Sequence, residues 1–253
     1  MKQKTSFIVQ ARSTSTRLPG KVLIPFYHTE TILDIQLNNL KNRFPGIPII
    51  IATTDNRADD LLANKYSENF TVFRGDENNV LKRFIDAAKQ YSVENIVRIC
   101  SDNPFLSMTH LSALIDSYFK TLPDYITYRF KNGTPAMKSH VGLFAEMVSL
   151  KALEAVKQST FDKLYTEHVT NYIYSNPEKF RLEFLQVPLI LEPFVDKLRL
   201  TIDTKEDFAS IQKLYLAVLK KGSDYTLEEI IAQVEADNGL LKEMIGQIEK
   251  YAK

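Results

Sequence analysis

Apolar residues in the first half of the chain follow two different spacings that alternate along the sequence. Short, nearly unbroken apolar runs typical of buried strands occupy residues 5–11, 47–54, 70–75 and 94–101. Apolar residues spaced three and four apart, as on one face of a helix, occupy residues 32–42, 57–69, 79–91 and 109–121. Strands that alternate with helices predict crossover units, and therefore an α/β fold with a mostly parallel central sheet flanked by helices.

The second half of the chain has a looser pattern after about residue 122. Its apolar spacing predicts three further strands, at residues 124–130, 181–188 and 198–203. It also predicts helices at residues 149–159, 163–176 and 204–222, followed by two charged helices at 226–237 and 239–253. We expect a single domain over residues 1–253, in which residues 122–197 form a smaller insertion that caps the sheet or makes an oligomer contact.

The bulk composition narrows the class of protein without indicating a chemistry. The chain has 253 residues, of which 44% are hydrophobic and 25% charged, as in ordinary globular proteins. The formal net charge is +1, so no overall field attracts nucleic acid or an anionic membrane, and any anion site must be local. One cysteine, no signal-peptide core and no apolar run long enough to cross a bilayer favour a cytoplasmic protein.

One stretch directly after the first predicted strand concentrates positive charge. Residues 10–23 read QARSTSTRLPGKVL and hold Arg12, Arg17 and Lys21. Ligands of open parallel sheets bind outside the carboxyl ends of the strands, so this loop is placed to bind a polyphosphate. It is neither a Walker A loop nor a Rossmann fingerprint, because both need more glycines than Gly20 alone. From charge alone, a solvated basic loop is an equal alternative.

The same stretch resembles the opening motif of the cytidylyltransferase family of acylneuraminate (CMP-sialic acid) synthetases, especially its spore-coat polysaccharide branch. Other segments resemble the family in the same order along the chain: VFRGDENNVLKRFIDAAK (72–89), IVRICSDNPF (96–105), EMVSLKALEAV (146–156), TEHVTNYIYSNPEKFRL (166–182) and RLTIDTKEDF (199–208). The resemblance covers most of the chain but not its last 30 or so residues. It implies a Rossmann-like nucleotidyltransferase fold.

The resemblance also implies a reaction. CTP transfers its CMP group to a hydroxyl of a small acidic sugar or polyol-type acceptor, pyrophosphate leaves, and the product serves surface polysaccharide biosynthesis. Mg²⁺ is the implied cofactor and a homodimer the implied assembly. Two alternatives stay open. One is a nucleotide-sugar glycosyltransferase, although no Asp-x-Asp triplet ends a predicted strand. The other is a non-catalytic nucleotide-binding relative.

The resemblance places the nucleotide site on loops that follow the first three predicted strands. Arg12 and Lys21 are the principal triphosphate anchors and count as catalytic, because cations there would neutralise charge on the departing pyrophosphate. The nucleotide-binding candidates are Gln10, Ala11, Arg12, Arg17, Lys21, Thr53, Arg74, Gly75 and Asp76. For Arg74 a surface ion pair is an equal alternative.

Two aspartates at the ends of predicted strands, Asp102 and Asp203, are the metal-binding and remaining catalytic candidates. Mg²⁺ in phosphoryl-transfer sites is held by one or two carboxylates together with phosphate oxygens. Helix capping is a weak alternative for Asp203, because Thr204 is better placed to cap and Asp207 can complete a capping box. Without a ligand, the two carboxylates should repel each other, so removal of one should not lower stability.

The acceptor site is the least defined part of the prediction. The resemblance gives Glu146 and the pair Glu167 and His168 as candidates, although a lone histidine is more often packed or solvent-exposed than catalytic. Arg129, Lys138 and His140 are looser candidates for holding an acceptor carboxylate or phosphate. Two positions depart from the family. Thr201 stands where sialic-acid synthetases usually have a second aspartate, and Phe144 replaces an acceptor-facing aspartate. These departures leave the acceptor and the number of metal ions open.

Aromatic residues are frequent in residues 122–197 and suggest a contact region for a second copy of the chain. The set is Tyr125, Tyr128, Phe130, Phe144, Tyr165, Tyr172 and Tyr174. Aromatic side chains are enriched at the centres of protein interfaces. The alternative is that they pack against the sheet of their own chain.

Overall fold

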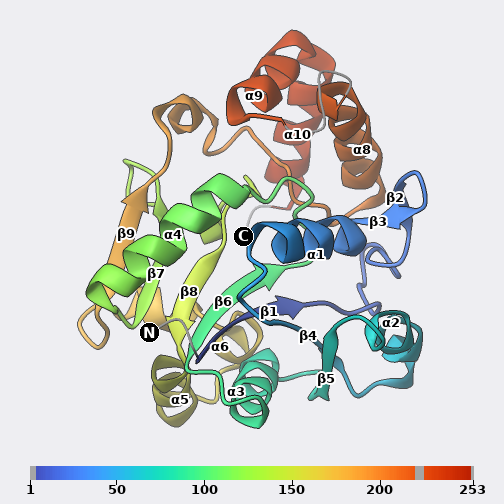
Figure 1. The fold of residues 1–253 in the computed structure, drawn as a ribbon. Helices are drawn as coiled ribbons and strands as arrows, with labels where there is room; N and C mark the ends of the chain where they lie inside the picture. Colours follow the sequence, from blue (N-terminus) through green and yellow to red (C-terminus); the bar gives the residue numbers. More distant parts are fainter. Residues whose placement is uncertain (1–3, 220–224, 252–253) are drawn as a thin grey trace.

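A seven-stranded sheet runs through the protein and separates two layers of helices in the computed structural model (Figure 1), which describes residues 4–219 and 225–251. The strands lie in the order β5-β4-β1-β6-β8-β7-β9. The first four in that order are β5 (Thr71–Gly75), β4 (Ile49–Thr54), β1 (Thr5–Gln10) and β6 (Asn95–Cys100), and they are mutually parallel. The predicted α/β fold with a mostly parallel sheet is therefore confirmed.

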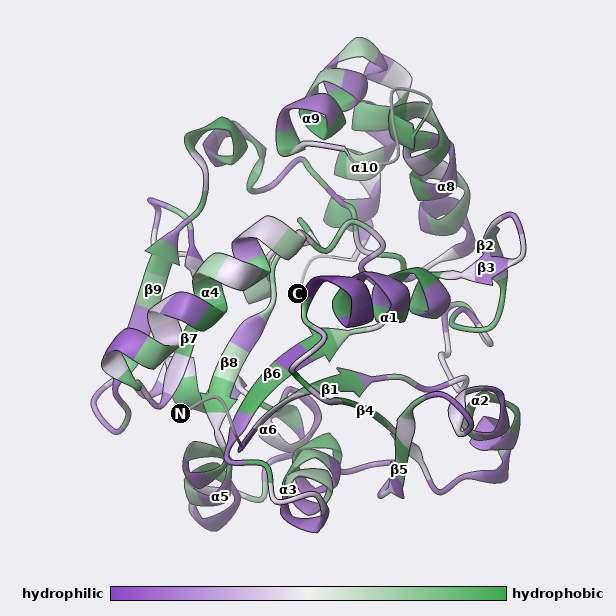
Figure 2. Ribbon diagram, in the orientation of Figure 1, coloured by the Kyte–Doolittle hydropathy of each residue, from purple (hydrophilic) through white to green (hydrophobic). Residues whose placement is uncertain are grey.

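Alternation of side chains along β1 divides the core into two parts. Phe7 and Val9 belong to the apolar cluster on one face, together with residues of α1 (Ile32–Arg43) and α4 (Met108–Thr121). Ile8 belongs to the cluster on the other face, with α3 (Val80–Gln90) and α5 (Leu150–Ser159). Successive side chains of a strand point to opposite faces, so a strand covered on both faces must be apolar throughout. Figure 2 shows hydrophobic colouring over much of β1 and β4.

Residues 122–197 contribute three strands to the same sheet. β7 (Tyr125–Arg129) and β9 (Leu182–Gln186) pair in parallel, while β8 (Glu146–Ser149) runs antiparallel to both β6 and β7. The pattern did not predict β8, because a four-residue strand that merges into the next helix has too few positions to show a period of two.

The aromatic residues of this region mostly pack inside their own chain. Tyr125, Tyr128, Phe130 and Phe144 are each 4% exposed or less. Their burial supports the alternative that these rings pack against the chain's own sheet. Most of the aromatic residues considered for an interface are therefore not available to contact a second chain. Phe161, which is 93% exposed, was not part of that set.

Two predicted elements are wrong. Residues 198–203 form no strand, because the segment crosses the ends of the strands and its N–H groups donate to the carbonyls of His140 and Asp102 instead of to a ladder. The predicted helix 163–176 is two short helices, α6 (Lys163–Glu167) and α7 (Asn171–Ser175). The break leaves Thr170 free to bond the buried Glu146.

The remaining elements are short or C-terminal. A two-stranded hairpin follows the basic loop, and short helices connect the larger elements: β2 (Pro25–Tyr27), β3 (Glu30–Thr31), η2 (Arg57–Asp59), α2 (Asp60–Tyr66), η3 (Ala136–Lys138) and η4 (Leu189–Phe194). The chain ends with α8 (Lys205–Leu219), α9 (Leu227–Ala236) and α10 (Asn238–Lys250). Residues 220–222 of the predicted helix 204–222, and 252–253 of the last one, lie outside the described residues. Within the described residues, every helix is too short or too polar to cross a membrane.

Candidate active site

The basic loop leaves the carboxyl end of β1 and folds back on itself before β2. The N–H of Gly20 donates to the carbonyl of Ser13 at 2.8 Å, and the N–H of Leu23 donates to the carbonyl of Gly20 at 2.8 Å. Gly20 has a φ of 70°, which a side chain would disfavour. The loop is thus a closed turn at the ligand-binding edge of the sheet, and not an extended solvated arm.

A buried carboxylate, Asp59, anchors this loop from the neighbouring η2 turn. Asp59 is fully buried and accepts hydrogen bonds from the backbone N–H of Ser13 at 2.6 Å and from the Ser13 hydroxyl at 2.5 Å. Its other oxygen accepts from the hydroxyl of Thr54. Burial alone would raise the pKa of Asp59, but the hydrogen bonds from Ser13 and Thr54 outweigh it and lower the pKa below its ordinary value.

Lys21 joins the two predicted metal-binding aspartates. Its Nζ lies 3.1 Å from Oδ2 of Asp102, 3.4 Å from Oδ1 of Asp203 and 2.7 Å from the carbonyl oxygen of Ile202. Burial tends to lower the pKa of Lys21, but the charges of Asp102 and Asp203 outweigh it and raise the pKa. The side chain is therefore charged at neutral pH, and three segments distant in sequence meet at one ammonium group.

Asp203 faces two further cations. Arg17 Nη2 lies 2.9 Å from its Oδ1, and Arg199 Nη2 lies 3.2 Å from its Oδ2. The Asp203 side chain does not cap α8, because the next residues do so. Thr204 and Asp207 exchange hydrogen bonds from the backbone N–H of each to the side chain of the other. The predicted capping box is confirmed, and the Asp203 carboxylate is left to the site.

Arg199 is a site residue that the sequence analysis missed. It is 1% exposed, and its guanidinium holds Asp207 through two hydrogen bonds of 2.7 and 2.8 Å. A third nitrogen, Nη1, lies 2.7 Å from Nδ1 of His140. Because arginine can only donate, Nδ1 must be the acceptor, which places the ring proton of a neutral His140 on Nε2.

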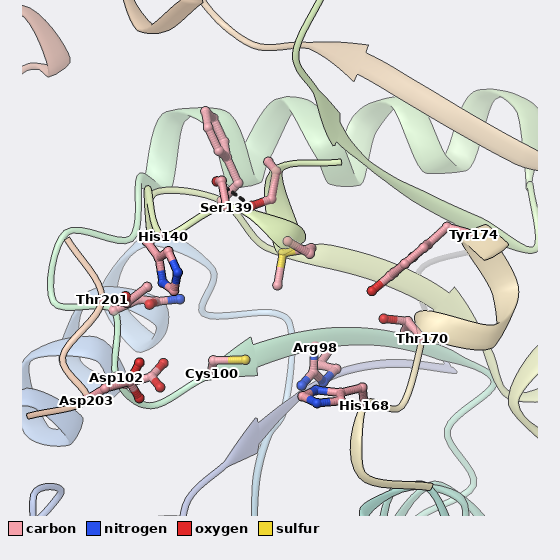
Figure 3. A pocket seen from close by; sticks show the side chains of 15 residues that line it. Arg98, Cys100, Asp102, Ser139, His140, His168, Thr170, Tyr174, Thr201 and Asp203 are labelled. Atoms are coloured by element: carbon pink, nitrogen blue, oxygen red, sulfur yellow. Dashed lines mark hydrogen bonds between the residues drawn. The ribbon is translucent and has the colours of Figure 1, made fainter. Parts of the chain in front are cut away.

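Beside these charges lies a pocket of about 140 Å³ (Figure 3). Asp102 and Asp203 stand at one end of it and Thr170 and Tyr174 at the other, with Cys100 between them. The rest of the lining is Arg98, Asn103, Ala136, Met137, Ser139, His140, Gly142, Phe144, His168 and Thr201. The polar groups are mostly neutral donors and acceptors, which suits a hydroxyl-bearing acceptor next to the paired carboxylates.

Two neighbouring positions keep the wall of this pocket tight. Gly142 has a φ of 63°, and a Cβ there would lie 3.1 Å from the backbone of Leu200 and Thr201. Phe144, which replaces an aspartate of the family, stacks on Tyr128 with ring centroids 4.5 Å apart. An apolar ring thus forms part of the lining where the resemblance implies a carboxylate.

Glu146 lies behind the pocket and does not line it. It is fully buried, and one oxygen lies 2.5 Å from Arg98 Nη1. The hydroxyl of Thr170 donates to the same carboxylate at 2.9 Å, and the Tyr125 hydroxyl also donates to it. The geometry therefore makes Glu146 a positioning group for Arg98 and Thr170, which do line the pocket.

The other acceptor candidates separate into two groups. His140 and His168 line the pocket, and His168 is brought there by the break between α6 and α7. Arg129 and Glu167 are not among the lining residues. The Arg129 guanidinium lies 4.4 Å from the ring centroid of Phe184 on the neighbouring strand, and Glu167 is an exposed residue at the end of α6.

The base-side candidates are held mainly by local contacts. Arg74 donates to the carbonyls of Thr54 and Asn56 and pairs with Asp60 at 2.6 Å, so the ion pair considered for it is present. The Asp76 carboxylate accepts from two N–H groups at the start of α3.

Close packing surrounds the same loop. A Cβ on Gly75 would lie 2.7 Å from the Phe73 ring. Thr53 is fully buried, and its hydroxyl has no hydrogen-bond partner among the described residues. Gln10 accepts a 3.0 Å bond from Arg98, while Ala11 is 1% exposed.

A second missed residue, Arg83, lies beneath this region. It is fully buried, and its Nη1 donates to the carbonyl of Asp76 at 2.8 Å. Burial, and then the charge of Arg12, lowers the pKa of its guanidinium. The charges of Asp59, Asp76 and Asp55 act on the pKa of Arg83 in the opposite direction, so Arg83 lies among charges of both signs beside the basic loop.

The fold and this arrangement define a nucleotidyltransferase. A family model described as cytidylyltransferase matches residues 6–225. The spore coat polysaccharide biosynthesis protein SpsF of Bacillus subtilis (strain 168) is 37% identical over 216 residues, which cover 83% of this chain and 85% of that protein. The chain therefore belongs to the cytidylyltransferase family, as the resemblance indicated.

Solved structures agree with this assignment. A cytidylyltransferase from Leptospira borgpetersenii serovar Hardjo-bovis superposes with a TM-score of 0.79 and 28% identity, over 94% of this chain and 96% of that chain. A CMP:2-keto-3-deoxy-manno-octonic acid synthetase complexed with CTP superposes with a TM-score of 0.63 and 11% identity, over 85% and 99% of the two chains. The second match shows a common fold.

The Asp59 anchor gives a prediction about stability and pH. Asp59→Asn replaces an acceptor of several hydrogen bonds by an amide and should lower the free energy of unfolding at pH 7 by about 2–3 kcal/mol. Because folding lowers the pKa of Asp59, its contribution is present above the unfolded value near 4 and is lost as pH falls through the folded value. Urea unfolding should show a smaller difference in unfolding free energy between the parent and Asp59→Asn at pH 3 than at pH 7. The exposed neighbour Asp55→Asn is the control, and a deficit that does not depend on pH would contradict the assignment.

The three cations around Asp203 change the expected effect of removing its carboxylate on stability. The sequence alone predicted that removal would not lower stability, because two carboxylates repel each other. Two bare carboxylates would repel, but Lys21, Arg17 and Arg199 already compensate Asp203. Asp203→Asn should therefore lower the unfolding free energy of the ligand-free protein by about 1–3 kcal/mol at pH 7. Chemical denaturation measures this difference, with the exposed Asp196→Asn as control. A variant as stable as the parent would restore the simple repulsion view.

Proposed function

We propose that the protein transfers CMP from CTP to a hydroxyl group of a small acidic sugar or polyol-type acceptor and releases pyrophosphate. The observation that carries the proposal is the meeting of Lys21 with Asp102 and Asp203 between the basic loop and the pocket. A polyanionic substrate, a divalent cation and a hydroxyl nucleophile would all find suitable partners within this short span.

The cations of the loop have distinct parts in this proposal. Lys21 is buried and held by three oxygens, so it is a fixed charge for the triphosphate, while Arg17 is half-exposed and can turn toward the departing pyrophosphate. Arg12 adds charge beside the buried Arg83. Charges positioned before the reaction stabilise the transition state without a cost of reorganisation.

The carboxylates fit a magnesium ion bound together with the nucleotide. Asp102 and Asp203 already converge on one positive group. The described residues hold no group of three or more histidine, cysteine or acidic side chains that could bind a metal alone. Two carboxylates completed by phosphate oxygens and water suit Mg²⁺. When bound, the ion would polarise the phosphate oxygens and neutralise charge on the leaving group.

The pocket lining supports an acceptor with several hydroxyl groups. In this proposal His140 and His168, which line the pocket, hold or move the acceptor's proton, and Thr170 and Tyr174 orient its far end. The name of the Bacillus relative supports surface polysaccharide biosynthesis as the setting. Pyrophosphate release from CTP over a panel of acidic sugars and polyols tests the proposal. Tight CTP binding with no release on any acceptor would favour a non-catalytic protein.

Nucleotide selection is the first prediction of this proposal. CTP with Mg²⁺ should raise the melting temperature more than UTP, GTP or ATP, because a ligand at about 100 times its Kd stabilises the folded state by about 2.7 kcal/mol. For a chain of this size that corresponds to roughly 5–10 °C. Lys21→Ala should lose most of the shift, whereas Lys151→Glu on the exposed side of α5 should keep it. Equal shifts with all four nucleotides would refute cytosine selection.

The metal assignment predicts how turnover responds to substitution. Asp102→Asn and Asp203→Asn should each lower kcat by about 100-fold or more and raise the Mg²⁺ concentration needed for half-maximal activity. The double variant should be little worse than either single one, because groups that act as a unit are not additive. Steady-state pyrophosphate release measures these effects. An Asp203→Asn enzyme with full activity and unchanged Mg²⁺ dependence would remove Asp203 from the metal site.

A further inference from the structure

A second and larger cavity, of about 690 Å³, lies between α1 and α4 on one side and the C-terminal helices α8 and α9 on the other. Its walls come from the end of α1, the start of α4, and α8 and α9. The family match ends at residue 225, so α9 closes the cavity from outside the matched region. Its lining is Asn39, Asn42, Arg43, Phe105, Leu106, Ser107, Met108, Thr109, His110, Leu143, Tyr215, Tyr225, Thr226, Leu227 and Ile230.

The lining has an aromatic wall and one charge. Phe105, Tyr215 and Tyr225 contact one another, with ring centroids 5.3 to 5.9 Å apart. Arg43 is the lining residue with a permanent charge, and it is exposed. His110 adds no charge at neutral pH, because burial lowers its pKa.

We propose that this cavity is a regulatory site for a small ligand that combines a flat ring with one anionic group. The ring would pack against the aromatic wall, and the anion would pair with Arg43 at the rim. The volume is in the range of small-molecule sites, and the lining combines apolar and polar side chains in about equal numbers, as a ligand with both a ring and a charged group requires. The site is separate from the nucleotide loop, and it does not depend on the acceptor proposed above.

Coupling to the active site follows from a wall that the two cavities share. Asn103 lines the first cavity and Phe105 the second, two residues further along the same loop after Asp102. Phe144 and His110 line opposite sides, and their rings meet edge-on at 5.4 Å. A ligand that displaces the loop or the His110 ring therefore acts directly on the pocket lining.

The C-terminal helices provide a second connection. Tyr251, directly after α10, lies under the guanidinium of Arg17, with 5.4 Å between Cζ and the ring centroid. Helices α9 and α10 pack on each other, so a shift of α9 at the cavity reaches the arginine that pairs with Asp203. Both connections end at groups of the proposed nucleotide site. A ligand in the second cavity regulates that site if it binds one arrangement of these groups more tightly than another.

The anionic aromatic probe 1-anilinonaphthalene-8-sulfonate tests the site without any turnover. Its fluorescence should rise on the folded protein with one-to-one stoichiometry, and saturating CTP with Mg²⁺ should not displace it competitively. Arg43→Glu should weaken binding about fivefold or more, and Leu227→Trp, which fills the cavity, should abolish it. Asn42→Trp at the rim serves if Leu227→Trp does not fold, and Lys151→Glu is the charge-matched control.

Hydrogen exchange then tests the coupling. With the probe bound, amide exchange should slow in residues 105–110 and change in residues 140–145, among which His140, Gly142 and Phe144 line the first cavity. Equal binding to the parent, Arg43→Glu and the tryptophan variants would place the probe elsewhere and overturn the site. Competitive displacement by CTP would assign the probe to the nucleotide loop. Cavity-dependent binding with no change in residues 140–145 would overturn the regulatory coupling.

Discussion

One buried ammonium group, that of Lys21, holds together parts of the chain that share no secondary structure. It bonds a loop after β1 to the turn after β6 and to the segment that leads into α8, in both cases through an aspartate. Because the carboxylates would repel without it, the charge makes their close approach stable. The buried Arg199 and Asp59 extend the same principle, since each fixes a functional segment by hydrogen bonds to charge.

The sequence predicted the parallel half of the sheet well because the signal there is local. The run at 47–54 is short and rich in β-branched residues, which favours a strand over a helix, and all six residues of β4 are buried as in a strand covered on both faces. The strand predicted at 198–203 was wrong for a related reason. Its Leu198, Leu200 and Ile202 alternate as in a strand and are buried, but the chain passes over the strand ends, where no ladder partner is available. An alternating apolar pattern indicates that a segment is extended and buried on one face, but it does not indicate whether the segment pairs with another strand.

The sequence identified some residues of the candidate site and missed others. Charged residues of the loop and the two aspartates stood out by position, and the structure brings Lys21, Asp102 and Asp203 together. Arg199 and Arg83 gave no comparable signal, because single arginines inside apolar stretches look like surface residues until their burial is known. Asp207 was the available clue to Arg199, since a buried capping carboxylate needs a partner.

The distribution of the site along the chain has a consequence for synthesis in the cell. Lys21 is made early, Asp102 midway, and Asp203 only after four-fifths of the chain. A nascent chain on the ribosome can pair β1 with β4 and β6, yet it lacks the carboxylate and the buried Arg199 that complete the charge arrangement. The candidate site is therefore completed late in synthesis, and a translation product truncated before residue 199 would have β1, β4 and β6 without the contacts of Asp203 to Lys21 and Arg199.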